Sequence, residues 1–135
     1  MSISIASRKQ KSRELQKWAC QKISEITGFE WGKDKPIESR PMGQSGPDVR
    51  MEGQVKEIFP FAIECKAQEN WSIHSWIKQA QSNQEGGGLQ WLLIAKRSRE
   101  KPVVIMDAER FFNLMETLSI AIWKDDQEEE ENEPN

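Results

Sequence analysis

The sequence predicts a mixed α/β domain in which a small central sheet is flanked by helices. Three features indicate this class: helical spacing of apolar residues near the start, short β-type runs in the middle, and a continuous apolar run further on. The 135 residues are enough for one domain with a buried core. We expect residues 1–123 to form that domain and residues 124–135 to be a disordered acidic tail.

The first expected element is an amphipathic helix over about residues 7–27, ended by Gly28, which readily adopts the left-handed conformation of a helix cap. Apolar side chains at helical spacing predict one buried stripe: Leu15, Trp18, Ala19, Ile23 and Ile26. Glu14 lies about 40° from Trp18 around the helix, at about 100° per residue, so we expect its carboxylate to border the core.

Three strands are predicted next, at residues 29–31, 47–52 and 58–66. A loop rich in proline and glycine, over residues 33–45, follows the first of them. Gly53 marks the turn between the last two strands, which we expect to pair as an antiparallel hairpin. Pro60 cannot donate to a ladder, so it places the start of the third strand at an edge or a bulge.

The second half of the chain alternates between helices and strands. A helix over about 72–84 is capped by Asn70 or Ser72 and ended by the glycines at 86–88. Its apolar face consists of Ile73, Trp76, Ile77 and Ala80. A buried strand at 90–95 and a strand at 102–106 follow. Asp107 then caps a last helix, which we expect to face the core with Phe111, Leu114, Met115 and Leu118.

The net charge of −3 hides an uneven distribution. Residues 125–135 hold seven acids and no base, and without them 15 acids face 19 bases. The folded body is therefore mildly basic, which suits a nucleic-acid partner without demanding one. Cys20 and Cys65 fit neither a disulfide framework nor a zinc site, and we expect both to be buried. No apolar run is long enough to cross a membrane and no signal peptide is present, so we expect a cytoplasmic protein.

The residues that carry chemistry lie on the two strands expected to form the hairpin. Side chains alternate across a strand, so Glu64 and Lys66 share one face, about 6.6 Å apart, while Ile63 and Cys65 face the core. With the strands paired, Asp48 lies opposite Glu64, with Cβ atoms about 4.5–5.5 Å apart. Two carboxylates at that distance repel each other unless a cation lies between them.

Oxygen ligands of this kind suit Mg²⁺, or Mn²⁺, rather than zinc. We expect Asp48, Glu64 and the backbone carbonyl of Cys65 to hold the ion, and Lys66 to assist the attacking water or the charge on the phosphate. Glu14 is a candidate ligand for a second ion. A helical glutamine, Gln79 or the weaker candidate Gln81, is a candidate partner for the water or the scissile phosphate.

Each of these residues also has a structural interpretation. Asp48 follows a Gly-Pro pair and would suit a simple turn. Glu64 and Lys66 would suit the solvated face of an edge strand. The two helical candidates would lie on helix surfaces, Gln79 in solvent and Glu14 paired with Lys11, Lys17 or Lys22.

The pattern Pro47-Asp48 followed by Glu64-Cys65-Lys66, with Glu14 and Gln79 on flanking helices, resembles the PD-(D/E)XK nuclease superfamily over roughly residues 8–112. The predicted order of elements is similar to its restriction-endonuclease-like αβββαβ core. The likeness is greatest to small phage and archaeal Holliday junction resolvases and other short phage endonucleases. It implies that Asp48 and Glu64 bind metal and that Lys66 is catalytic.

Two basic segments are candidates for binding DNA phosphates or, alternatively, ordinary solvated surface. One lies in the first helix and the other between the last two strands: Arg8, Lys9, Lys11 and Arg13, then Lys96, Arg97, Arg99 and Lys101.

Together, the residues and the resemblance predict a magnesium-dependent endodeoxyribonuclease that leaves a 5′-phosphate, in the cytoplasm of a bacterial, archaeal or phage-infected cell. The resolvase likeness implies branched DNA and a homodimer, because two symmetric cuts need two subunits. Two alternatives stay open. One is a nuclease of the same fold that acts in repair, restriction or end processing, and the other is a DNA-binding module that has lost cleavage.

Overall fold

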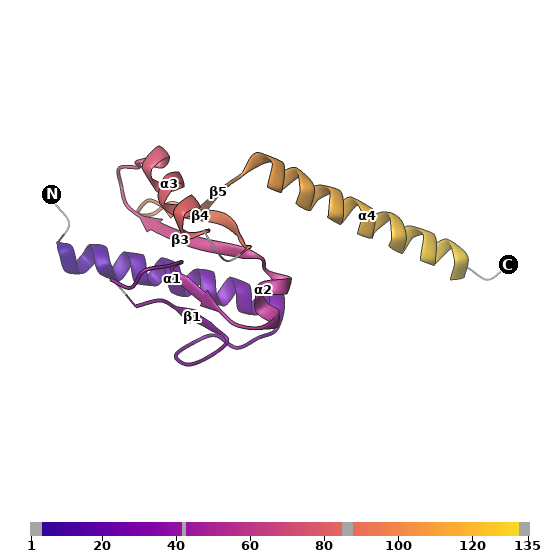
Figure 1. The fold of residues 1–135 in the computed structure, drawn as a ribbon, viewed down its shortest axis with the longest axis horizontal. Helices are drawn as coiled ribbons and strands as arrows, with labels where there is room; N and C mark the ends of the chain where they lie inside the picture. The colour runs from indigo at the N-terminus through magenta and orange to yellow at the C-terminus, as the bar shows by residue number, and fades with distance from the viewer. Residues whose placement is uncertain (1–3, 42, 85–87, 133–135) are drawn as a thin grey trace. The chain divides into compact units, whose positions relative to one another are not determined.

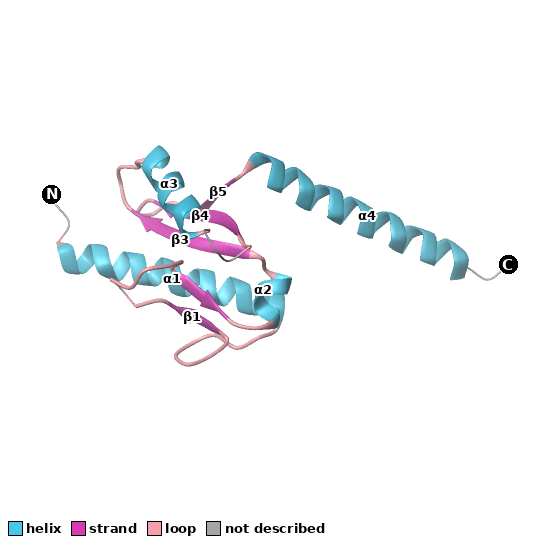
Figure 2. Cartoon of the chain, in the orientation of Figure 1, coloured by secondary structure: helices cyan, strands magenta, loops and turns pink. Residues whose placement is uncertain are grey.

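The computed structural model describes residues 4–41, 43–84 and 88–132. Its elements follow the order α1 (Ile5–Thr27), β1 (Ile37–Ser39), β2 (Val49–Met51), α2 (Gln54–Ile58), β3 (Phe61–Ala67), α3 (Ile73–Asn83), β4 (Gln90–Lys96), β5 (Val103–Met106) and α4 (Ala108–Asn132) (Figures 1 and 2). The chain divides into two compact units, Met1–Ile105 and Met106–Asn135. The mixed α/β class is confirmed, with a restriction-endonuclease-like order of elements in the first unit.

Strand β3 is the centre of the first unit, with α1 on one side and α3 on the other (Figure 1). It lies at the end of a sheet with the order β3-β4-β5 and pairs in parallel with β4, from Phe61 opposite Gln90 to Ala67 opposite Lys96. Strands β1 and β2 form a separate antiparallel pair, with Ile37 opposite Met51. One edge of β3 is therefore left without a continuous strand partner among the described residues.

Helix α1 begins at Ile5, two residues before its predicted start, and is ended by Gly28 as predicted. The Ser4 hydroxyl accepts a hydrogen bond from the Ser7 amide, and Gly28, at φ 78°, donates to the Ser24 carbonyl at 2.8 Å. Its buried face consists of Leu15, Gln16, Ala19, Cys20 and Ile23. Trp18 and Ile26 were wrongly predicted to be buried and are 39% and 64% exposed. The buried stripe is rotated toward Gln16, which accepts a 2.6 Å hydrogen bond from the Ser39 hydroxyl on β1.

The region between α1 and β3 differs most from the sequence prediction. Strand β1 lies inside the predicted loop, and the predicted strand at 29–31 is only an isolated bridge between Trp31 and Ile37. The predicted hairpin is wrong because β2 pairs with β1 and because α2 separates β2 from β3. Helix α2 forms because its Val55 is fully buried, so a core contact stabilises five residues that propensity alone leaves undecided.

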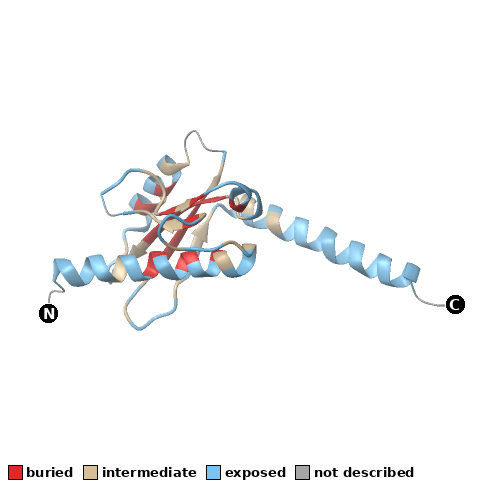
Figure 3. Cartoon of the chain, turned by 90° about the horizontal axis from the view of Figure 1, so that it is seen from below, coloured by how far each residue is buried: buried red, intermediate tan, exposed pale blue. Residues whose placement is uncertain are grey.

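Strands β3 and β4 are buried on both faces, as is typical of a parallel pair covered by helices (Figure 3). In β4 this produces the predicted apolar run at 91–95. In β3 the buried residues include Glu64, which is only 4% exposed, so the strand face that carries Glu64 is covered as well as the face that carries Ile63 and Cys65. Cys20 and Cys65 are buried free thiols, as expected, and burial raises the pKa of Cys20 to about 11.

Helix α3 covers the other side of the sheet. Trp76 and Ala80 pack in one cluster with Trp91, Leu93 and Ala95 of β4, while Ile73 is 40% exposed. Ser72 is the N-cap by position, but its side chain makes no capping hydrogen bond. Of the three glycines predicted to end the helix, Gly86 and Gly87 lie outside the described residues.

In the second unit, the Asp107 carboxylate accepts a 2.9 Å hydrogen bond from the Arg110 amide, which confirms the predicted N-cap of α4. Within this unit the helix stands alone, with Phe111, Met115 and Leu118 46%, 45% and 51% exposed. That its apolar face, with Leu114, packs on the core stays a prediction. The helix also continues to Asn132, through the segment predicted to be disordered, because glutamate and glutamine are good helix formers.

No helix in the described part of the chain combines the length and the apolar character needed to cross a membrane.

Candidate active site

Asp48 is held against the open edge of β3 by two hydrogen bonds. Its backbone amide donates to the Ile63 carbonyl at 2.8 Å, and its Oδ2 accepts from the Cys65 amide at 2.7 Å. The residue between these two partners is Glu64. Asp48 therefore lies opposite Glu64, as the sequence predicts, although local hydrogen bonds rather than a hairpin ladder place it there.

The backbone of Cys65 faces the same edge. The N–H and C=O groups of one residue in an extended strand project to the same side. Because the Cys65 N–H points at the Asp48 carboxylate, the Cys65 carbonyl oxygen is directed to that edge as well. This orientation is compatible with the expected third oxygen ligand.

Glu64 and Lys66 share the face of β3 that α3 covers. The Lys66 Nζ lies 3.6 Å from Glu64 Oε1 and 6.0 Å from the centre of the Trp76 ring. The Asn83 amide donates a 2.8 Å hydrogen bond to Glu64 Oε2. The Glu64 carboxyl is thus placed between an ammonium group and an amide donor.

The two acids affect each other's ionisation. Burial, followed by the nearby charge of Asp48, raises the pKa of Glu64 to about 7, against the lowering effects of Lys66 and Asn83. Burial also raises the pKa of Asp48, while the Cys65 amide, Lys66 and Arg40 lower it. Burial therefore favours the protonated form of both acids, despite the cations beside them.

This donor set fits a hard divalent cation. A cation between Asp48 and Glu64 would stabilise both as carboxylates, and metal binding would displace the proton that Glu64 holds near neutral pH. Among the described residues, no group of three or more His, Cys, Asp or Glu side chains is placed to hold a metal ion. Carbonyl and water oxygens would complete the coordination, as Mg²⁺ commonly requires.

Two predicted site residues are not brought to the carboxylates. Glu14 is exposed and accepts a hydrogen bond from Gln10 one turn earlier, which corresponds to the surface alternative. Gln79 and Gln81 are exposed on α3. The helical amide that reaches Glu64 belongs to Asn83, which sequence reasoning missed. Asn83 lies seven positions after Trp76, so helical spacing places Asn83 on the buried face of α3. That spacing could have identified Asn83 from the sequence.

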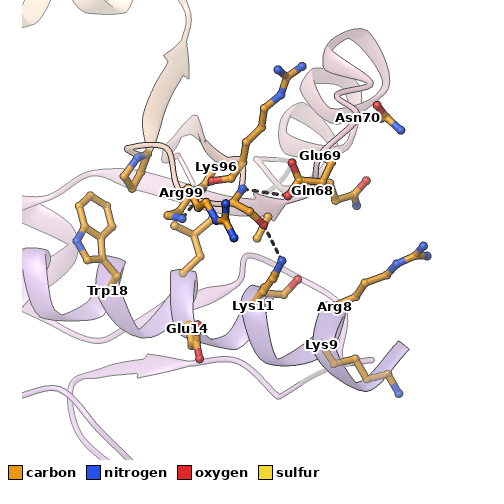
Figure 4. Close-up of a pocket in the computed structure, with 16 residues that line it drawn as sticks. Arg8, Lys9, Lys11, Glu14, Trp18, Gln68, Glu69, Asn70, Lys96 and Arg99 are labelled. Carbon is orange, nitrogen blue, oxygen red and sulfur yellow. Dashed lines mark hydrogen bonds between the residues drawn. The ribbon is translucent and has the colours of Figure 1, made fainter. Parts of the chain in front are cut away.

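The two predicted basic segments meet around one cavity of about 1010 Å³ (Figure 4). We call it the basic cavity; its cations come from α1 and from the β4–β5 region: Arg8, Lys9, Lys11, Lys96, Arg97 and Arg99. Arg13 and Lys101 are not among its lining residues. The Lys11 ammonium donates to the Ser98 hydroxyl at 2.6 Å, which ties α1 to the loop after β4. The cavity also contacts Ala67 and Gln68, next to Lys66 along the chain.

Glu69 lines the basic cavity and holds the loop after β4. Glu69 accepts a 3.0 Å hydrogen bond from the Ser98 amide, and contacts with Ser98, then the charges of Lys11 and Arg97, lower the pKa of Glu69. The Arg97 guanidinium lies 5.5 Å from the centre of the Trp71 ring. The loop is therefore held in place while most of its positive charge stays available.

An acid at the edge of β3, a buried acid on that strand and a lysine two residues later, in this order of elements, define the PD-(D/E)XK class of nucleases. The chain matches a family described as "Phage putative PDDEXK endonuclease" over residues 12–133, which omits only the first eleven and last two residues. It belongs to this family of phage PD-(D/E)XK endonucleases. No curated protein and no solved structure showed significant similarity to the chain.

Proposed function

We propose that this protein is a metal-dependent endodeoxyribonuclease that cuts branched DNA in the manner of a Holliday junction resolvase. The observation that supports the catalytic part is that the Asp48 carboxylate accepts from the Cys65 amide, directly after Glu64, whose carboxyl lies 3.6 Å from the Lys66 ammonium. Membership of an endonuclease family supports the same reaction class. The preference for branched DNA rests on the resemblance to small phage and archaeal resolvases.

In the proposed reaction, a water oxygen forms a bond to phosphorus while the bond from phosphorus to the 3′-oxygen breaks. The attacking water gives up a proton and the departing 3′-oxygen takes one up, so the products are a 5′-phosphate and a 3′-hydroxyl. Asp48, Glu64 and the Cys65 carbonyl would hold Mg²⁺ or Mn²⁺. Such an ion supplies positive charge at the scissile phosphate and lowers the pKa of bound water.

The protein's own side chains orient these groups. Lys66, as a cation, stabilises negative charge that develops on the phosphate oxygens, and its contact with Glu64 fixes its position. Asn83 holds the Glu64 carboxyl from the other side and limits its rotation. The basic cavity binds flanking phosphates through Arg97, Arg99 and the α1 cations. A homodimer would supply the two symmetric cuts.

Cleavage of a panel of DNA substrates tests the proposal. Wild-type protein and Asp48→Asn are incubated with an immobile four-way junction, a flap, single-stranded DNA and linear duplex, in Mg²⁺ and in Ca²⁺. We expect wild type to cut the junction in Mg²⁺ only, and the variant to bind without cutting. Preferential cutting of another substrate would instead support a repair, restriction or end-processing nuclease. Binding without any cutting at high protein concentration would support a cleavage-dead module.

A further inference from the structure

A second, smaller hollow of about 190 Å³ opens beside the two acids, toward the start of β3. Its walls include Pro47, Ala62 and Asn83. Pro47 precedes Asp48, Ala62 lies two residues before Glu64 on the same face of β3, and Asn83 donates to Glu64. The hollow is therefore lined by neighbours of both acids, although neither acid lines it, and Ala62 places it on the opposite side of Glu64 from Lys66 along the strand.

The lining of this hollow is positively charged. Arg40, Arg50 and Lys56 contribute to it, and no aspartate or glutamate is among its described lining residues. Arg50 is neutralised by ion pairs with Glu38, at 2.9 Å, and with Glu52. Arg40 and Lys56 supply the charge that is left for a ligand, so the hollow suits an anion.

Arg40 is fixed to the segment that carries Asp48. Its backbone amide donates to the Asp48 carbonyl at 2.7 Å, and its Nε donates to the Pro47 carbonyl at 2.6 Å. A Cβ at Gly46 would lie 3.2 Å from the Arg40 Cζ, so the glycine leaves room for the guanidinium. A guanidinium offers five N–H donors, and hydrogen bonds within the described residues use only the one at Nε.

We propose that this hollow, here called the Arg40 hollow, is a phosphate-binding subsite, in which Arg40 and Lys56 bind a backbone phosphate of the DNA next to the phosphate that is cut. This inference rests on the proposed nuclease function. The planar guanidinium can donate two parallel hydrogen bonds to one phosphate, which an ammonium group cannot do. Because Arg40 also holds Pro47 and Asp48, a phosphate bound there has a fixed position relative to the carboxylates.

The test measures DNA binding rather than cleavage. Arg40→Gln, Lys56→Gln and the control Lys35→Gln are each made in the Asp48→Asn background, and affinity for a four-way junction and for duplex DNA is measured in Ca²⁺ over a range of salt concentrations. We expect the Arg40 and Lys56 variants each to reduce the slope of log affinity against log salt by about 1, and to weaken binding of both DNAs. Lys35→Gln should leave the slope unchanged, because Lys35 pairs with Glu30 at 2.9 Å and lies outside the hollow.

The controls separate the possible outcomes. An unchanged salt slope in folded Arg40→Gln, or an equal change in Lys35→Gln, would overturn the subsite. If Arg40→Gln does not fold, the exposed Lys56 decides the question, because an unchanged slope in Lys56→Gln would overturn it as well. Wild-type protein that binds DNA but cuts none would reject the nuclease function, whereas the salt slopes would still test the subsite.

Discussion

Asn83 donates a 2.8 Å hydrogen bond from the end of α3 to the buried carboxyl of Glu64 on β3. A donor to a carboxyl group favours its charged form, so Asn83 opposes the effect of burial on the pKa of Glu64. Through this contact the end of α3 borders the candidate active site, whereas Trp76 and Ala80 of the same helix pack in the hydrophobic core.

Replacing Asn83 by alanine should therefore impair cleavage more than the same change at Gln79, which is exposed on the same helix. A hydrogen bond to a charged group contributes about 1.5–3 kcal/mol, so we expect the single-turnover cleavage rate to fall about ten-fold or more. Equal rates in Asn83→Ala and wild type would show that the contact has no part in the reaction.

Glu64→Gln and Lys66→Ala should each reduce cleavage by about a hundred-fold or more, because each removes a charge at the reacting phosphate. Affinity for DNA in Ca²⁺ should change little. Lys78→Ala, an exposed lysine on α3, is the matched control for Lys66 and should cut normally. Retained cutting by either site variant would reject the role given to that residue.

The metal-free protein should lose stability as the pH rises from about 4.5 to about 7. The folded pKa of Glu64 is above its ordinary value of 4.5, so in this window the folded state binds more protons than the unfolded state. The raised pKa of Asp48 acts in the same direction. The shift of Glu64 corresponds to a loss of the order of 3 kcal/mol. Urea unfolding at pH 5 and pH 8 measures this difference.

Glu64→Gln provides the control for this pH dependence, because glutamine does not titrate. Most of the difference between the two pH values should disappear in that variant. A wild-type protein that is equally stable at both pH values, or a variant with an unchanged difference, would contradict the raised pKa.

Arg97→Gln and Arg99→Gln should each weaken DNA binding and lower its salt slope by about 1. Both side chains line the basic cavity. Lys22→Gln is a suitable control, since Lys22 lies outside the cavity on α1 and contacts Glu25 at 3.7 Å. An equal loss of slope in the control would indicate a general effect of net charge.

Removing residues 125–135 should leave the folding of the rest of the chain unchanged, since α4 buries none of its residues. The far-UV circular dichroism should lose helical signal, because α4 continues to Asn132. A large fall in the melting temperature would show that this segment has stabilising contacts.

The sequence predicts elements whose pattern is set locally and fails where tertiary contacts decide. Helix α1, strand β4 and the Asp107 cap follow directly from spacing and capping residues. Strand β1 has only three residues and lies between Pro36 and Pro41. A run this short has no periodic pattern that distinguishes a strand from a loop. The spacing predicts that Asp48 and Glu64 lie close together, as the structure has them. The sequence does not reveal the contact of Asn83 with Glu64, because a helical amide is recognised only once its face and its partner are known.

The parallel pairing of β3 with β4 has a consequence for synthesis of the protein. Glu64 lies opposite Leu93, so the strand that carries the site gains its hydrogen-bonded neighbour only after the chain has been made to that point. Such distant pairing closes a long loop and is intrinsically slow. A growing chain on the ribosome therefore lacks the buried surroundings of Glu64 until β4 has emerged.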